Sequence, residues 1–101
     1  MEVTAKRLYG GNMTIAATNV YTVPSGTITF VKAITICNTA ASAGTVTLYF
    51  GEVPLIYEHV IKGKDTLTIP FFDQIMMSGE KINIRGSAAN ITLYISGKEV
   101  T

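Results

Sequence analysis

Residues 45–50 read Thr45-Val46-Thr47-Leu48-Tyr49-Phe50, so that apolar side chains alternate with threonines and a tyrosine. Side chains on a β-strand point alternately to its two faces, and this stretch therefore predicts a strand with one apolar and one polar face. The same period of two recurs in residues 81–85 and 91–96. Strands of this kind are typical of antiparallel sheets that bury one face and expose the other.

The composition of the whole chain favours strands over helices. Of the 101 residues, 14 are threonine, 12 are isoleucine and 8 are valine. These β-branched side chains fit a pleated sheet better than a helix, and no convincing apolar stripe of helical period is present. Clusters of glycine, proline, serine and asparagine predict turns at residues 10–12, 24–26, 42–44, 62–65, 78–80 and 87–90.

These turns divide the chain into short strands. The predicted strands cover residues 2–9, 13–17, 19–23, 27–38, 44–51, 54–62, 65–70, 74–77, 80–86 and 90–100. About eight strands at such spacing predict an all-β fold, an antiparallel β-sandwich or jelly roll, with a small barrel as a further alternative. We expect a single β-sandwich domain over residues 10–101, preceded by residues 1–9 as an N-terminal arm or edge strand. Gly10-Gly11 would be the hinge of such an arm.

Two of the predicted strands do not alternate simply. In residues 28–37, the even-numbered side chains are predicted to share one face, which Lys32 interrupts. The odd-numbered side chains are also mostly apolar, which favours a strand that is covered on both sides. In residues 55–61, neither face is uniformly apolar. A β-bulge would explain this pattern, and so would a second buried surface made with another subunit.

Charge and cysteine content exclude several classes of function. The formal net charge is +1, which leaves no basic surface for nucleic acid. With 48% hydrophobic and 15% charged residues, the chain is not expected to be disordered. The single cysteine, Cys37, excludes an internal disulfide and any zinc site that needs several cysteines. Because neither a signal peptide nor a membrane-spanning apolar run is found, we expect a soluble protein that is made in a reducing compartment.

Residues that could carry chemistry are few and scattered. The one histidine, His59, follows Glu58 in a predicted strand, so the two side chains should point to opposite faces and form neither a metal site nor a proton relay. Cys37 lacks a nucleophile motif and is expected in the core. No glycine-rich segment leads into a helix, as a phosphate-binding loop requires. We expect no enzymatic activity, cofactor or metal; a carboxylate pair assembled by the fold is the remaining enzymatic alternative.

Several aromatic and apolar side chains do not fit a single core. Phe71-Phe72 and Met76-Met77 are doublets, and adjacent strand residues face opposite sides. For both doublets, an inter-sheet crossover and a subunit contact are open interpretations. Outward-facing tyrosines either stabilise a strand or make contacts with a partner. The candidate interface residues are Tyr9, Tyr49, Tyr94, Phe71 and Phe72.

Two stretches resemble one group of known proteins. Residues 21–40 open with Tyr21-Thr22-Val23-Pro24-Ser25-Gly26 and continue through Lys32 to a turn at Asn38-Thr39. Residues 78–100, from Ser78-Gly79-Glu80 to Lys98-Glu99-Val100, resemble a closing hairpin of the same group. This group comprises small structural proteins of tailed bacteriophages, which occur as capsid-decoration, head-fibre or tail-associated modules. Ser25 stands where alanine is often found in that group.

The resemblance implies a virion protein, made in the cytoplasm of the bacterial host, which forms a homo-oligomer such as a trimer and binds major capsid or tail proteins. We expect capsid decoration or head attachment, because the chain is short and has no fibrous repeat; a tail or baseplate subunit is the alternative. A carbohydrate- or receptor-binding β-sandwich of a tail fibre is another, although the chain lacks tryptophan. Tyr49 and Tyr94 buried between subunits would favour assembly, and an open concave surface around them would favour ligand binding.

Overall fold

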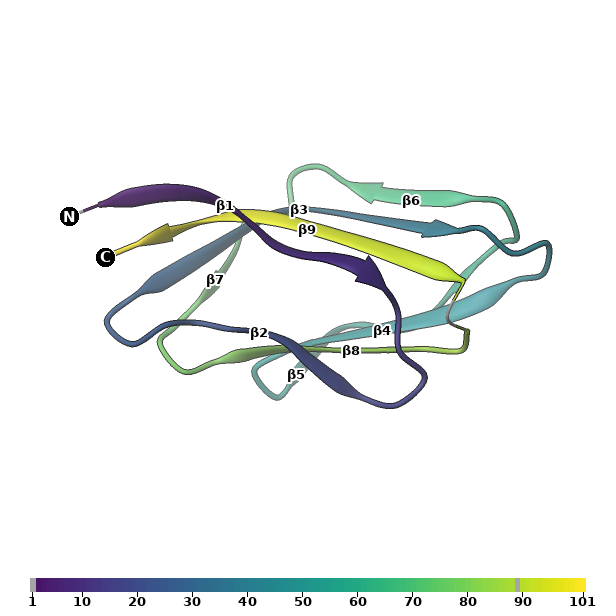
Figure 1. Cartoon of the computed structure of the whole chain (residues 1–101), viewed down its shortest axis with the longest axis horizontal. Coiled ribbons are helices and arrows are strands. Elements are labelled where there is room, and N and C mark those ends of the chain that lie inside the picture. The colour runs from purple at the N-terminus through teal and green to yellow at the C-terminus, as the bar shows by residue number, and fades with distance from the viewer. Residues whose placement is uncertain (1, 89) are drawn as a thin grey trace.

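The computed structural model describes residues 2–88 and 90–101, and it shows two antiparallel β-sheets that share one core. The five-stranded sheet contains β1 (Val3–Asn12), β9 (Ile91–Val100) and β3 (Ile28–Asn38), with β6 (Thr66–Ile69) and β7 (Gln74–Met76) both paired to the far side of β3. The four-stranded sheet has the order β2 (Thr18–Thr22), β8 (Lys81–Gly86), β4 (Gly44–Phe50) and β5 (Val53–Ile61). Figure 1 shows the two sheets as two layers. No helix among the described residues has the length and apolar character to cross a membrane.

The connections between strands define the topology. The chain passes from one sheet to the other at most connections, and only the β4–β5 and β6–β7 connections stay within a sheet. This is the connectivity of a jelly roll in which β6 and β7 together occupy the place of one strand. The predicted fold class, an antiparallel β-sandwich or jelly roll of about eight strands, is therefore confirmed.

Most predicted strands end within one residue of those observed, but the N-terminal segment differs. The turn predicted at residues 10–12 and the strand predicted at residues 13–17 are wrong, because β1 continues through Gly10 and Gly11 to Asn12. β1 pairs with β9 along its length, so residues 3–9 lie in an edge strand and Gly10-Gly11 is part of a ladder. Met1 of the predicted arm and Ala89 of the turn predicted at residues 87–90 lie outside the described residues.

The core consists of the inward-facing apolar side chains of both sheets. The alternation in β4, β8 and β9 places their apolar faces inside, as the sequence predicts. Burial of each large aliphatic side chain contributes about 1.5–3 kcal/mol to the stability of the fold. The buried apolar residues are Leu8, Met13, Tyr21, Val23, Val31, Ile34, Ile36, Val46, Leu48, Phe50, Ile61, Met76, Ile82, Ile84, Ile91, Leu93 and Ile95.

Bulges account for both strands with irregular alternation. In β3, Lys32 is an extra residue in the pairing with β9. Thr29 and Val31 are therefore fully buried ahead of the bulge, whereas Ile28 is exposed, and the face predicted for the even-numbered residues is wrong in this part of the strand. In β5, the pairing with β4 shifts around Glu58, whose φ is 48°. Of the two explanations left open for residues 55–61, the β-bulge is thus confirmed.

Candidate functional site

Exposed apolar side chains gather along one edge of the sandwich, where β5 of one sheet lies beside β6 and β7 of the other. Five of these side chains lie on β5, on β7 or directly after β7 and expose 39–61% of their surface, and Phe71, in the connection between β6 and β7, exposes 87%. The other exposed large apolar side chains among the described residues are Val3, Ile15, Ile28, Val60 and Tyr94. We use the term open edge for the six residues Val53, Leu55, Tyr57, Phe71, Ile75 and Met77.

Two depressions make the open edge continuous. The first lies between β5 and β6, where Leu55 and Tyr57 face Leu67 and Ile69. The second lies between β5 and β7, where Val53, Leu55 and Ile75 line it together with the polar residues Gln74 and Glu80. Because Leu55 contributes to both depressions, apolar surface extends from β6 across β5 to β7. Contiguous apolar surface of this kind is typical of interaction sites rather than of ordinary solvent-exposed faces.

The connection between β6 and β7 explains why this edge stays uncovered. Pro70 follows the last residue of β6, and proline cannot donate a ladder hydrogen bond, so the strand ends there. The chain then leaves the sheet and is held by Phe72, whose backbone N–H donates to the Lys32 carbonyl oxygen at 2.8 Å. An ion pair between Lys32 and Asp73 holds the same segment. The extra residue of the β3 bulge therefore anchors the connection that interrupts the strand.

Phe71 and Phe72 lie on opposite sides of this connection. The Phe72 ring packs edge-on against Phe50, with ring centroids 5.5 Å apart, while Phe71 projects into solvent. The inter-sheet crossover considered for this doublet is wrong, because β6 and β7 both pair with β3. Met76 and Met77 divide in the same way, with Met76 buried and Met77 exposed, and here the crossover is confirmed, because the β7–β8 connection passes from one sheet to the other. A subunit contact through Phe71 remains a prediction.

The three tyrosines predicted as interface residues lie away from the open edge. Tyr9 is half-buried against the core, and its hydroxyl donates to the Asn12 carbonyl oxygen at 2.8 Å. Tyr49 lies on the outer face of the four-stranded sheet, since Leu48 and Phe50 on either side of it point into the core. Tyr94 lies on the outer face of the five-stranded sheet, paired with Gly10 and Thr35. No single contact surface on one molecule therefore contains both Tyr49 and Tyr94.

Tyr94 packs against its own sheet. A Cβ atom placed on Gly10 would lie 3.3 Å from the Tyr94 ring, which shows that the ring covers the glycine of the neighbouring edge strand. The Arg7 guanidinium carbon lies 5.9 Å from the ring centroid. Aromatic cover of this kind protects a glycine in an edge strand. Tyr94 thus stabilises the β1–β9 pair, although half of its surface stays exposed.

The fold separates the residues that could bind a metal or take part in catalysis. His59 lines the depression between β5 and β6, whereas Glu58 lines a depression on the outer face of the four-stranded sheet, which confirms their predicted opposite orientation. Cys37 is half-buried on the outer face of the five-stranded sheet, so its expected core position is wrong; Ile36 occupies the inward position instead. Within residues 2–88 and 90–101, no three His, Cys, Asp or Glu side chains are grouped to hold a metal ion.

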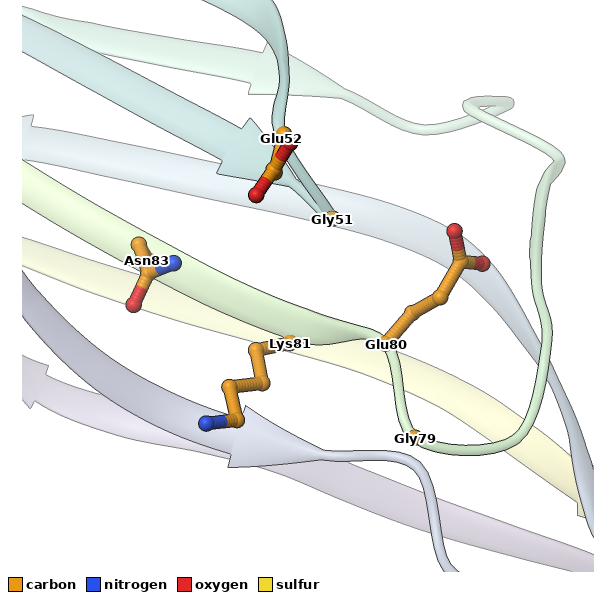
Figure 2. A pocket seen from close by; sticks show the side chains of 6 residues that line it. All are labelled: Gly51, Glu52, Gly79, Glu80, Lys81 and Asn83. Atoms are coloured by element: carbon orange, nitrogen blue, oxygen red, sulfur yellow. The ribbon is translucent and has the colours of Figure 1, made fainter.

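A polar depression lies where the turn between β4 and β5 meets the turn before β8 (Figure 2). Its residues make hydrogen bonds within and between the two turns. Glu80 Oε1 accepts a hydrogen bond of 2.7 Å from the Met77 N–H, and the Gly51 N–H donates to the Lys81 carbonyl oxygen at 2.8 Å. Gly51 adopts a φ of 64°, which glycine tolerates without steric cost. The side chains of Glu80 and Lys81 point apart in Figure 2, so they do not form an acid–base pair.

The open edge is the surface that distinguishes this molecule, and sequence reasoning found only part of it. Phe71 was predicted as a contact residue, whereas Val53, Leu55 and Ile75 were not. The irregular pattern of residues 55–61 was the available signal, because it left open a second buried surface on that strand. No family model matches the chain, and no curated protein has a similar sequence.

Proposed function

We propose that the chain is a non-enzymatic structural protein of a bacteriophage particle, which docks to copies of itself and to the particle through the open edge. The open edge is the observation that carries this proposal, because four of its exposed apolar side chains line two depressions that share Leu55; they are Val53, Leu55, Tyr57 and Ile75. Isolated exposed apolar residues are ordinary on a soluble protein, whereas a contiguous group is costly to leave in water and favours a binding role.

The fold is compatible with the two stretches that resemble phage structural proteins. Residues 21–40 contain β3 and residues 78–100 contain β8 and β9, and β3 pairs with β9 at the centre of the five-stranded sheet. Asn38 is buried, and its side-chain amide donates to the carbonyl oxygens of Ser42 and Ile61 at 3.0 and 3.1 Å. The resembling residues thus hold the sandwich together. Jelly rolls serve in viral capsids and in lectins, so the fold supports the proposal only by analogy.

The proposed location is the virion, after synthesis in the bacterial cytoplasm. Capsid decoration or head attachment is the proposed position, and a tail or baseplate ring would use the same surface. A formal net charge of +1 produces little repulsion between neighbouring copies. A symmetric particle presents one docking site many times, so a modest affinity of each contact is sufficient for stable attachment.

Immuno-electron microscopy tests the virion assignment. Gold-labelled antibodies raised against the purified chain are applied to phage particles from a culture that expresses the protein. We expect the gold to lie on the particles, and its position on heads or tails decides between the two locations. Gold on free protein only, with no gold on the particles, would contradict the proposal.

A pair of charge substitutions tests the surface. Leu55→Glu places a carboxylate where the two depressions of the open edge meet. Ile15→Glu is the matched control, because Ile15 is 68% exposed and lies outside the open edge. Binding of the fluorescently labelled Leu55→Glu chain to particles that have been stripped of the protein should fall at least tenfold, while Ile15→Glu binds like the wild type. Equal binding by both variants would show that the open edge is not the docking surface.

A further inference from the structure

We infer that a second copy of this chain covers the open edge, and that a two-fold axis relates the two copies so that Phe71 of each inserts between β5 and β6 of the other. This inference rests on the proposed function, because it assigns a partner and a geometry to the same surface. Phe71 supplies the projecting group, and the depression between β5 and β6 supplies its receptor.

Phe71 is presented by a segment that is already ordered. The hydrogen bond from Phe72 to Lys32, the ion pair between Lys32 and Asp73, and the contact of Phe72 with Phe50 hold the residues on its C-terminal side. An aromatic side chain on an anchored segment loses little conformational entropy when it is covered by a partner. Central aromatic anchors of this kind dominate the free energy of many protein interfaces.

The receptor lies on the same edge as the projecting group. Ile69 lines the depression between β5 and β6, and Pro70 alone separates it from Phe71. The walls of the depression include Leu55 and Leu67, whose apolar side chains suit a phenyl ring, and the imidazole of His59 also lines it. When the projecting side chain and its receptor depression lie side by side on one surface, a two-fold axis places the side chain of each copy opposite the depression of the other.

The distribution of exposed apolar residues favours the two-fold arrangement over a ring. A ring with three or more members joins two different surfaces of each subunit, whereas a two-fold dimer joins one surface to itself. Among the described residues, Val3, Ile15, Ile28, Val60 and Tyr94 are the exposed large apolar side chains outside the open edge. They lie on β1, β3, β5, β9 and the β1–β2 connection, and none of them lines either depression of the open edge. Ile15 and Tyr94 line two separate depressions, so these residues do not form a second apolar group around one shared depression in the described part of the chain.

The size of the open edge fits a partner of this kind. At the observed exposures, six such side chains present roughly 600 Å² of apolar surface, at the upper end of the range for the largest patch on a monomer. A stable interface buries about 800 Å² on each partner, which the half-buried rim of the two depressions would complete. Lys32 and Asp73 form an ion pair with each other within each copy, and the Glu80 carboxylate that lines the second depression accepts the Met77 N–H.

The contact is made by side chains rather than by strand addition. β5 is an edge strand, but Pro54 lacks a backbone N–H and the bulge at Glu58 disrupts the regular ladder. Proline and bulges are devices that prevent edge strands from pairing with other chains. The backbone of β5 is therefore a poor template for a second strand, whereas the apolar side chains beside it remain free to pack.

Sedimentation velocity over a concentration series tests the arrangement. The wild-type chain should show a monomer–dimer equilibrium, and Phe71→Ala should weaken the dimer roughly 30-fold, as expected for an aromatic anchor. Because Phe71 is 87% exposed in the single chain, this substitution should leave the melting temperature unchanged at concentrations where both proteins are monomeric. Ile15→Ala is the matched control, since Ile15 is similarly exposed outside the open edge, and it should dimerise like the wild type.

A mixing experiment distinguishes reciprocal insertion from other contacts. Leu67→Glu blocks the receptor and, when present in both copies, should weaken the dimer at least as much as Phe71→Ala does. A 1:1 mixture of the two variants should recover association, because one intact Phe71 then meets one intact receptor. A dimer that ignores Phe71→Ala, a mixture that does not recover, a trimer, or a strict monomer at millimolar concentration would each overturn the inference. Binding of the same proteins to phage particles is measured separately, so the proposed function stands or falls by its own result.

Discussion

The Tyr21 hydroxyl donates a 2.5 Å hydrogen bond to Glu99 Oε2 and thereby joins the two sheets. Tyr21 lies on β2 of the four-stranded sheet, and Glu99 lies on β9 of the five-stranded sheet. The Thr29 hydroxyl oxygen forms a hydrogen bond of 2.7 Å with the Tyr21 hydroxyl oxygen, and Lys6 Nζ lies 3.4 Å from the Glu99 carboxylate. The ends of β1 and β9 extend beyond the four-stranded sheet here (Figure 1), so this polar group closes an end of the sandwich where apolar packing runs out.

Replacement of Tyr21 by phenylalanine tests the contribution of this contact. Tyr21→Phe keeps the ring in the core but removes the donor that the Glu99 carboxylate accepts from. We expect a loss of about 1–2 kcal/mol in the free energy of unfolding, measured by urea denaturation, because a hydrogen bond to a charged group is stronger than one between neutral groups. Tyr57→Phe removes a hydroxyl from an exposed ring and should leave stability unchanged. Equal stability of both variants would show that the contact between the sheets contributes nothing.

The pH dependence of stability should also reveal Tyr21. Burial, and then the hydrogen bond and charge of Glu99, raise the pKa of Tyr21 to about 12, although the hydrogen bond with Thr29 acts in the opposite direction. A tyrosine in the unfolded chain ionises near pH 10. Because the folded pKa is the higher one, the neutral phenol stabilises the fold fully below about pH 10, and this stabilisation is lost as the pH rises through about 12.

The measurement compares wild type with Tyr21→Phe across this range. The difference between their free energies of unfolding should be constant at neutral pH and should shrink between about pH 10 and pH 12. The comparison removes the effect of lysines and of the other tyrosines, which both proteins share. A difference that grows in alkali, or a phenolate absorbance at 295 nm that includes Tyr21 near pH 10, would contradict the raised pKa.

The sequence predicts the sheets well because the relevant signal is local. Val46, Leu48 and Ile84 lie where their alternation predicts, and turn residues mark most strand ends. The error in β3 has a specific cause: Lys32 is an extra residue in the β3–β9 ladder, and it moves every earlier side chain to the other face. The polar interruption at Lys32 was visible in the sequence, but the bulge that it makes against β9 and its ion pair with Asp73 were not.

The open edge depends on contacts between segments that are distant in sequence. Nothing local in Val53 or Ile75 indicates exposure, since each side chain also suits a buried strand. Their exposure follows from the end of β6 at Pro70 and from the position of β5 beside β6 and β7. The hinge expected at Gly10-Gly11 has the same explanation. The Tyr94 ring that covers Gly10 is distant in sequence, so the local pattern did not indicate that Gly10 lies in a paired strand.

Replacement of Tyr94 separates a structural role from a contact role. Tyr94→Ala uncovers Gly10 and removes the ring beside Arg7, so we expect a loss of about 1 kcal/mol in the free energy of unfolding. Tyr94→Phe keeps the ring and should be as stable as the wild type. Self-association, measured by sedimentation velocity, should be unchanged in both variants. Weaker association without loss of stability would instead support the interface role predicted for Tyr94 from the sequence.

Removal of the N-terminal segment tests whether residues 1–9 act as an edge strand or as an arm. In the structure, Leu8 is 6% exposed and packs in the core, while residues 3–7 are exposed and pair with β9. Deletion of residues 1–9 removes a core leucine and uncovers β9, and it should cost at least about 3 kcal/mol of stability in urea denaturation. Deletion of residues 1–5 keeps Leu8 and should cost much less. If the longer deletion leaves the melting temperature unchanged and impairs only binding to phage particles, the segment is an arm that reaches a neighbouring subunit.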